Sequence, residues 1–234
     1  MRATSWEFTN RALIFGLIFG VSFALYFIDH DNSTATLANW LGPRLGLDAK
    51  LVARALFLCA ALLLTFSAFI RTWASSYLHA SVVYSATVKT DSLIGDGPYR
   101  QVRNPLYFAN VLMAIGVGSM MSRIGFFVAV IAMVVFCYRL ILREENELHA
   151  TQGDSYERYR KAVPRLWPAL SPRIPPSGRH PKWADGLKAE FWYWGIAASV
   201  AAFAVTLSFR AFFLTLAASF LLFWVSSSVL QKKS

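Results

Sequence analysis

The hydrophobic residues of this chain come in long blocks separated by polar stretches, and they do not alternate with polar residues. Six blocks reach or approach the roughly 20 residues that a helix needs to cross a bilayer. They cover residues 12–28, 51–70, 106–121, 124–142, 191–209 and 211–230. Because backbone groups find no water partner in lipid, each block is predicted to be a helix. The sequence therefore predicts an all-α, polytopic integral membrane protein with about six transmembrane helices.

Two of these blocks carry further information. The third and fourth are separated by Ser122 and Arg123 alone, which predicts a tight helical hairpin. The first follows Arg2 and Arg11 and could be mistaken for a secretion signal. Its apolar run exceeds the 7–15 residues typical of a signal core, so we expect a retained first helix.

Composition and charge agree with a membrane location. Charged residues make up 15% of the chain, against roughly 25% in soluble domains, and the net charge is +10. If the N-terminus is cytoplasmic and all six blocks cross, most basic residues lie inside, as the positive-inside rule requires. The basic residues outside would be Arg44, Lys50, Arg54, Arg123 and Arg210. No basic helix or aromatic-basic groove pattern favours nucleic-acid binding.

This arrangement places both chain ends in the cytoplasm, and the short loops favour a prokaryotic inner membrane. Residues 29–50 are expected to form an external loop, whereas 71–104 and 143–190 are expected to be cytoplasmic. Within the latter, 144–162 is predicted to extend the fourth block as a helix with a break near Gly153. Six prolines from Pro164 onward predict an irregular linker, since proline does not fit a helix interior.

The expected organisation has four parts. They are an N-terminal transmembrane helix and external loop (1–50), a membrane core (51–168), a proline-rich cytoplasmic linker (169–190) and a C-terminal helix pair (191–234). Cys59 and Cys137 both lie in apolar blocks and are interpreted as buried hydrophobes. The histidines show no spacing typical of a metal site.

Three polar segments are candidates for chemistry. The first is LIGDGPYRQVRNPLY, residues 93–107, at the start of the third block. Pro105 suits a first helical position, and Asn104 before it suits an N-cap. Arg100 and Arg103 add positive charge beside a helix N-terminus, a place that favours carboxylate or phosphate. A simple helix cap with two positive-inside arginines explains this segment equally well.

The other two segments flank the predicted cytoplasmic helix. REENEL, residues 143–148, puts three carboxylates near a helix C-terminus, where they oppose the macrodipole and need partners. GDSYERYRKAVPRLWP, residues 153–168, places Tyr156 and Tyr159 on one helix face. Each segment alone also fits a solvated helix end or an interfacial helix anchored by tyrosines.

Taken in order, the three segments resemble the isoprenylcysteine carboxyl methyltransferase family and its relatives, the membrane phospholipid N-methyltransferases. The pattern is GPYR-x-x-RNP-x-Y, a helical hairpin, then EE-x-x-L-x-x-x-x-G-x-x-Y-x-x-Y-x-x-x-VPR. The resemblance covers about residues 51–168 and is dense from Leu93 onward. It implies S-adenosylmethionine as cofactor and methyl transfer to a lipid-like acceptor, bearing a carboxylate, amine or thiol, at the cytoplasmic membrane face.

By position, the resemblance implies a set of cofactor-binding residues drawn from all three segments. They are Leu93, Ile94, Tyr99, Arg103, Asn104, Pro105, Leu106, Tyr107, Glu144, Tyr156 and Tyr159. Glu144 or Glu145 would accept from the cofactor ammonium, and arginine or helix-start N–H groups would bind its carboxylate. Tyr99 and Tyr107 would contact the adenine or the sulfonium.

Catalytic roles are implied for Arg139, Arg143 and Glu145. The family's arginine near the acceptor falls on Leu140 here, so Arg139 or Arg143 is expected to substitute. Glu145 or Glu147 would accept a proton from an amine or thiol acceptor, whereas a carboxylate acceptor needs no base. Asn104 and Asp91 stand where many relatives have histidine, which removes a group that titrates near neutral pH.

Two other functions fit the same pattern. A membrane reductase related to the sterol reductases shares a tyrosine–arginine–proline pattern and would bind NADPH instead. A non-catalytic membrane binding or assembly protein would keep the fold and bind no nucleotide cofactor. No phosphate-binding loop, dinucleotide fingerprint or nucleophile elbow is present.

Overall fold

The computed structural model describes residues 2–78 and 95–231, and side chains within α9 up to residue 225. In these ranges all regular structure is helical, apart from one isolated bridge between Asn32 and Ser122. The predicted all-α class is confirmed. The elements are α1 (Ser5–Thr9), α2 (Arg11–Ala24), η1 (Leu25–Phe27), α3 (Ser33–Leu45), α4 (Ala49–Tyr77), η2 (Gly97–Arg100), α6 (Pro105–Gly118), α7 (Arg123–Ala162), α8 (Trp183–Thr206) and α9 (Phe209–Gln231).

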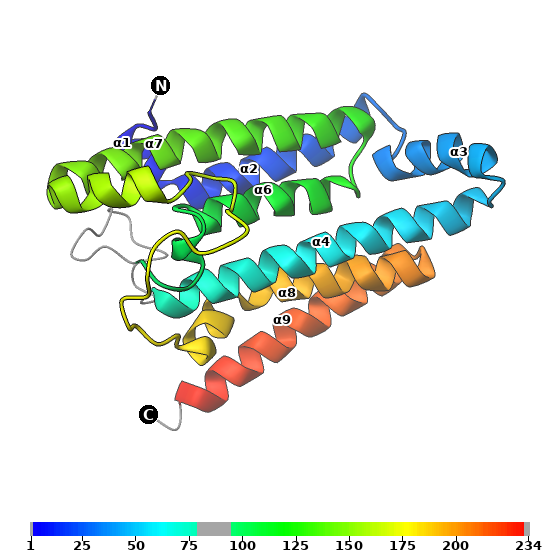
Figure 1. Cartoon of the computed structure of the whole chain (residues 1–234). Helices are drawn as coiled ribbons and strands as arrows, with labels where there is room; N and C mark the ends of the chain where they lie inside the picture. The colour runs from blue at the N-terminus through cyan, green and yellow to red at the C-terminus, as the bar shows by residue number, and fades with distance from the viewer. Residues whose placement is uncertain (1, 79–94, 232–234) are drawn as a thin grey trace.

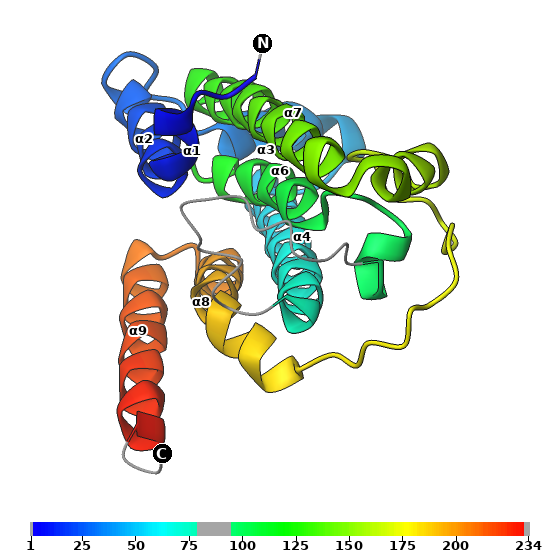
Figure 2. The ribbon, with the colours of Figure 1, turned by 90° about the vertical axis from the view of Figure 1, so that its left-hand side faces the viewer.

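The long helices run side by side in an elongated bundle, with both chain ends at the same end of it (Figure 1). Helix α4 is central, since it packs against α3, α6 and α8. Helix α7 packs against α2 and α6, and α9 packs against α8 (Figure 2). A core of buried apolar residues, including Ala60, Leu64 and Val200, fills the space around α4 and α8.

A buried ion pair joins α8 to this core. The Arg71 guanidinium of α4 donates to both Glu190 carboxylate oxygens at 2.5 and 3.2 Å. It also donates to Asn110 of α6 at 2.6 Å, and Ser75 donates to Glu190 at 2.6 Å. Breaking such a buried pair is costly, because it leaves a charge without a partner. These four residues therefore fix α4, α6 and α8 relative to one another.

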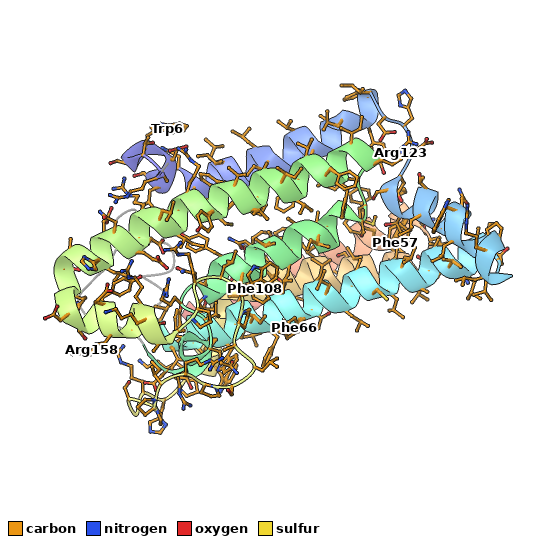
Figure 3. All side chains as sticks on the ribbon, turned by 45° about the horizontal axis from the view of Figure 1, so that its top comes forward. Trp6, Phe57, Phe66, Phe108, Arg123 and Arg158 are labelled. Atoms are coloured by element: carbon orange, nitrogen blue, oxygen red, sulfur yellow. The ribbon has the colours of Figure 1, made fainter. Side chains whose placement is uncertain are left out.

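Two helices, α4 and α7, are long and apolar enough to cross a membrane. Shorter apolar helices cover Arg11–Phe27, Pro105–Gly118 and Phe209–Val225. Apolar side chains project from the outer faces of α4 and α7 along their length (Figure 3), and Leu62, Phe66, Phe127 and Ile131 are each more than half exposed. Such a large exposed apolar surface is typical of a bilayer contact.

The hairpin and the helix break are confirmed. Helix α6 ends at Gly118 and α7 begins at Arg123, where the Ser122 hydroxyl accepts a 3.1 Å hydrogen bond from the Gly125 N–H. Gly153 has φ 51° and ψ −127°, a conformation that side chains disfavour, and α7 turns back toward the bundle there. From Val163 to Lys182 the chain forms no helix, as the prolines predicted.

The expected external loop at 29–50 is wrong in one respect, because most of it is helix α3. The Asn32 side chain accepts from the Ala35 N–H at 2.8 Å and caps the helix start. Gly46 ends it in the left-handed conformation, with φ 65°. Pro43 therefore lies in the last turn of this helix, and Gly46 ends it.

Candidate functional site

Two of the predicted segments meet at the end of the bundle that also holds the chain termini. The Tyr107 hydroxyl, in the first turns of α6, donates a 2.6 Å hydrogen bond to Glu144 of α7. Pro105 is the first residue of α6, where its missing N–H costs nothing. The tight hairpin sets the two helices antiparallel, so the start of α6 faces the part of α7 just after its apolar stretch.

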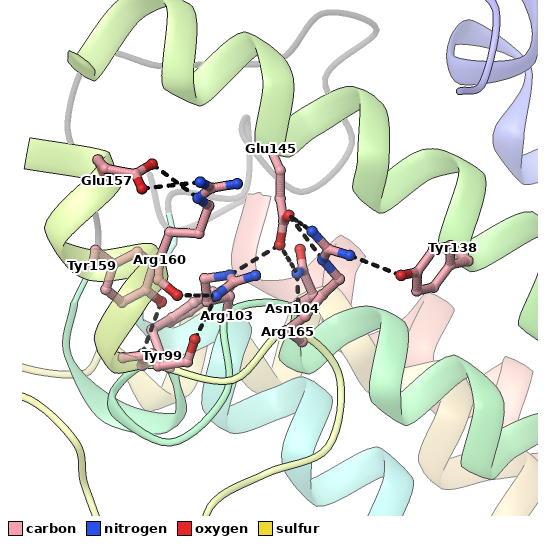
Figure 4. A network of polar contacts seen from close by, with 10 residues as sticks. Tyr99, Arg103, Asn104, Tyr138, Glu145, Glu157, Tyr159, Arg160 and Arg165 are labelled. Atoms are coloured by element: carbon pink, nitrogen blue, oxygen red, sulfur yellow. Dashed lines mark hydrogen bonds and ion pairs between the residues drawn. The ribbon is translucent and has the colours of Figure 1, made fainter. Parts of the chain in front are cut away.

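The neighbouring carboxylate, Glu145, is buried in a polar network (Figure 4). It accepts from Arg103 at 3.0 Å, from Asn104 at 3.2 Å and from Arg165 at 2.9 Å. Arg165 also donates to the Tyr138 hydroxyl at 2.8 Å. Two guanidinium groups therefore neutralise Glu145, so it joins three segments of the chain together.

Asn104 occupies the N-cap position of α6, but its side chain makes no cap hydrogen bond. Its amide donates instead to Glu145 and to the Arg165 carbonyl, the latter at 3.0 Å. The predicted N-cap position is confirmed, but the side chain turns toward the carboxylate of α7 and forms no cap hydrogen bond. A charged acceptor forms a stronger hydrogen bond than a neutral one, which favours this orientation.

The turn before α6 is bound to the last turn of α7. The Tyr159 hydroxyl donates to the Tyr99 carbonyl at 2.8 Å. The Arg103 guanidinium donates to the Arg160 and Val163 carbonyls at 2.5 and 2.6 Å. Arginine at a helix C-terminus binds carbonyls that have no intrahelical partner. Burial raises the pKa of Tyr159, so its phenol stays protonated and remains a donor.

Tyr156 has a different environment. Its side chain is 1% exposed and packs against Tyr159 and Val163. Its hydroxyl has no hydrogen-bond partner among the described residues. Burial raises its pKa, so this hydroxyl is a neutral donor. Buried polar groups almost always have a partner, so a ligand or a water molecule is the expected one.

Glu144 retains capacity to bind a cation. It lies two residues beyond the apolar stretch 124–142, is partly buried, and accepts from Tyr107. A carboxylate offers about four lone-pair sites. Burial raises the pKa of Glu144 from 4.5 to about 7, against the opposing effects of the Tyr107 hydrogen bond and the Arg11 charge. A cationic ligand beside it would favour the ionised form.

The proline-rich linker passes around the turn at residues 96–104 (Figure 2). The buried Asp96 carboxylate accepts from the Ser177 hydroxyl, from the Ser177 N–H at 2.8 Å and from the Arg179 N–H at 3.1 Å. Burial would raise the pKa of Asp96, but these hydrogen bonds outweigh it and hold the pKa below its usual 3.8. Arg100 donates to the Ile174 carbonyl at 2.9 Å. The linker thus positions the turn as well as joining two helices.

Arg139 and Arg143 lie away from Glu145, on the side of α7 that faces the N-terminal segment. Arg139 donates to the Glu7 carboxylate at 2.7 Å. Arg143 pairs with Glu147 at 2.9 Å and donates to Ser5 at 3.2 Å. Leu140, between them in sequence, is fully buried against α2 and α6. The structure therefore does not bring these two arginines to the Glu145 network.

The remaining predicted residues divide into two groups. Leu106 lies at the start of α6 beside Pro105 and Tyr107. Leu93 and Ile94 lie outside the described residues, as does Asp91. One cavity lies at the opposite end of the bundle, and another lies between α8 and α9.

Several residues at this site were missed by the sequence analysis. Arg165 is the second arginine on Glu145, and Asp96 anchors the linker. The VPR sequence that contains Arg165 was noted as part of the motif, which was the available signal. No local signal pointed to Asp96, because its partners Ser177 and Arg179 lie about 80 residues further along the chain.

Residues 2–78 and 95–231 contain no group of three or more His, Cys, Asp or Glu side chains that could hold a metal ion.

The central segment of the chain is similar to known proteins. Residues 55–154 match the phospholipid methyltransferase family model. The chain is 34% identical over 118 residues to protein-S-isoprenylcysteine O-methyltransferase of Schizosaccharomyces pombe, which covers 49% of this chain and 48% of that protein. No solved structure matches the chain.

Two metal-resistance proteins are also similar. The chain is 26% identical over 101 residues to cobalt-zinc-cadmium resistance protein CzcN of Cupriavidus metallidurans, covering 43% of this chain and 44% of that protein. It is 25% identical over 124 residues to nickel-cobalt-cadmium resistance protein NccN of Alcaligenes xylosoxydans xylosoxydans, covering 53% and 55%. The matches span about half the length of each of these curated relatives. The resemblance is confirmed as a similarity: residues 55–154 match the phospholipid methyltransferase family model, and about half of the chain is similar to an isoprenylcysteine O-methyltransferase.

Proposed function

We propose that this chain is an S-adenosylmethionine-dependent methyltransferase that acts on an amphipathic acceptor at the cytoplasmic face of a membrane. One observation carries the proposal. Three segments that are separate in sequence, at residues 96–107, 144–145 and 156–165, form one polar cluster at the end of an apolar bundle. That cluster contains a half-buried carboxylate with spare acceptor capacity and a buried phenol without a described partner.

The residues present fit the cofactor. Glu144 offers a carboxylate to the ammonium group, and its raised pKa falls again when a cation lies beside it. Tyr156 offers its unpaired hydroxyl, and Tyr99 and Tyr107 offer aromatic rings for stacking or cation–π contact. Glu145, neutralised by Arg103 and Arg165, is better placed to position these groups than to take the ammonium or a proton.

The reaction needs alignment more than acid–base chemistry. When bound, S-adenosylmethionine supplies the methyl group from its sulfonium. Rigid positioning of two reactants can contribute about 7–11 kcal/mol to catalysis. The Glu145 network and the linker hydrogen bonds on Asp96 supply such rigidity by joining η2, α6 and α7. A carboxylate acceptor then needs no base, because it is already a nucleophile.

The acceptor is proposed to arrive laterally through the bilayer. The exposed apolar faces of α4 and α7 offer a path for a lipid-like tail to the polar cluster. Arg139 and Arg143 lie on the side of α7 that contacts α1. This side is near the proposed membrane surface, where the two arginines would contact the acceptor headgroup. The acceptor role predicted for these two arginines therefore stays a proposal, separate from the Glu145 network.

The proposed topology has six spans, with α2, α4, α6, α7, α8 and α9 in the membrane and the cluster on the cytoplasmic side. Both chain ends lie at the cluster's end of the bundle, as an even number of crossings requires (Figure 1). A prokaryotic inner membrane remains our preferred location. The four-part division at residues 50, 168 and 190 stays a proposal, but α8 begins at Trp183, so the irregular part of the linker ends at Lys182.

A methyl-transfer assay tests this function. Purified full-length protein in detergent is incubated with radiolabelled methyl donor and a membrane lipid extract, and the labelled product is identified. We expect label in an amphipathic product, and loss of most of it with Glu144→Gln. Transfer that is absent with every lipid and prenylcysteine fraction, or unchanged in Glu144→Gln, would contradict the proposal. The same protein titrated with NADPH tests the reductase alternative.

A further inference from the structure

We infer that the chain binds an anionic phospholipid at the end of the bundle opposite the methyltransferase site. A cavity of about 420 Å³ lies there between α3, the start of α4 and the turn from α8 to α9. Its volume is within the 300–1,000 Å³ typical of small-molecule sites. This inference depends on the chain lying in a bilayer and is independent of methyl transfer.

The walls of the cavity suit an acyl chain. Ala38 of α3, Ala53 and Phe57 of α4 and Phe203 of α8 are all buried and line it. The small side chains at Ala38 and Ala53 leave the space that larger residues would fill. An apolar cavity of this kind excludes water and takes hydrocarbon.

The charge at the mouth of the cavity suits an anionic headgroup. Lys50 lines the cavity at the start of α4, just before the apolar stretch 51–70, where a lysine reaches the membrane interface. Arg54 lies one turn further along α4. Neither residue forms an ion pair with a described carboxylate, and both are exposed.

The acidic residues at this end are already engaged. Asp48 caps α4 by accepting from the Lys50 and Leu51 N–H groups at 2.8 and 3.2 Å. Asp29 and Asp31 pair with Arg123 at 2.7 and 3.1 Å. The positive charge of Lys50 and Arg54 therefore has no described intramolecular counterion, and a lipid phosphate is the complementary partner. Asn39, which also lines the cavity, adds an amide donor beside it.

Photolabelling in nanodiscs tests this site. The full chain is reconstituted with a trace of phosphatidylglycerol carrying a diazirine in its acyl chain, or with the matching phosphatidylcholine probe. After irradiation, labelled peptides are mapped by mass spectrometry. We expect labelling of 35–57 and 203–209, at least several-fold stronger with the anionic probe. Equal labelling by both probes, or no labelling of these residues, overturns the inference.

Two variants, each with a control, distinguish the headgroup contact from the acyl-chain cavity. Lys50→Glu should reduce labelling by the anionic probe toward the level of the zwitterionic probe, whereas Lys188→Glu, at the other end of α8, should not. Ala53→Trp fills the cavity and should abolish labelling by both probes. Leu62→Trp places a tryptophan on the exposed face of α4, outside the cavity, and should leave labelling intact. Labelling that survives both Lys50→Glu and Ala53→Trp contradicts the site. Because Lys50 is at the surface, its variant remains informative even if Ala53→Trp fails to fold.

Discussion

The Tyr107 hydroxyl donates a 2.6 Å hydrogen bond to the Glu144 carboxylate, joining the start of α6 to the part of α7 that follows its apolar stretch. The contact brings together residues 37 positions apart. It also places a partly buried carboxylate of raised pKa at the end of an apolar bundle.

Cofactor affinity should depend on pH through Glu144. Its pKa of about 7 means that the carboxylate is mostly protonated below pH 7 and ionised above it. A cationic ammonium binds the ionised form, so affinity for S-adenosylmethionine should increase as pH rises through about 7 and then level off. Tryptophan fluorescence titrations from pH 6 to 8 measure this. Glu144→Gln should bind more weakly and lose this pH dependence, and a wild-type affinity that is flat over this range would exclude the role.

Tyr156→Phe distinguishes a ligand contact from a structural one. The hydroxyl has no described protein partner, so its removal should leave the unfolding temperature unchanged or slightly higher. If it bonds the cofactor, affinity should fall about threefold to tenfold, corresponding to a net hydrogen bond of roughly 0.5–1.5 kcal/mol. Tyr159→Phe is the matched control, since it loses the bond to the Tyr99 carbonyl and should lower stability. An unchanged affinity in Tyr156→Phe would assign water as the partner.

Glu145 should matter for stability more than for proton transfer. Glu145→Ala leaves Arg103 and Arg165 without their carboxylate partner in a largely buried cluster. This should lower the free energy of unfolding by roughly 3–5 kcal/mol. Glu145→Gln keeps the shape and two acceptor lone pairs, so it should be milder. Thermal unfolding in detergent compares them. A Glu145→Gln protein that is fully stable but has lost methyl transfer would show a catalytic role instead.

The Arg71–Glu190 pair should couple the C-terminal helices to the core. Either Arg71→Met or Glu190→Gln leaves a buried partner unsatisfied and should lower the unfolding temperature strongly. The double variant Arg71→Met/Glu190→Gln should be less destabilised than the sum of the two single changes. Strict additivity in a double-mutant cycle would show that the two side chains do not interact as described.

Arg139→Ala tests the acceptor role proposed for this arginine. Its partner Glu7 belongs to α1, outside the cofactor cluster, so cofactor affinity should not change. The KM for the acceptor should rise, because a headgroup contact is lost. Lys161→Ala, an exposed basic residue on the same helix, provides the control. A cofactor affinity that falls in Arg139→Ala would instead assign this residue to the cofactor site.

Much of the fold could be predicted from local patterns. Unbroken apolar blocks, the two-residue gap at Ser122–Arg123 and Gly153 predicted the helices, the hairpin and the break in α7. Helix α3 was missed because Pro43 lies in its last turn and Gly46, three residues later, ends it, and two such residues close together are also typical of a loop.

The site was predictable in part. The motif identified Arg103, Asn104, Tyr107 and the acidic pair, whose contacts the structure describes. It could not show which carboxylate the arginines neutralise, because that depends on how α7 is rotated about its axis. It could not assign Arg139 and Arg143 either, since both contact the N-terminal segment, at Glu7 and Ser5, far away in sequence.

The central claim is that the turn ending at Tyr107 and the carboxylate of Glu144 together bind S-adenosylmethionine. Isothermal titration calorimetry of the purified chain at pH 8, with wild type and Glu144→Gln side by side, tests it most directly. The account predicts one site per chain in the wild type and an affinity at least about tenfold weaker in the variant, with its unfolding temperature retained. No heat of binding in the folded wild-type protein, or equal affinities in the two, would contradict it.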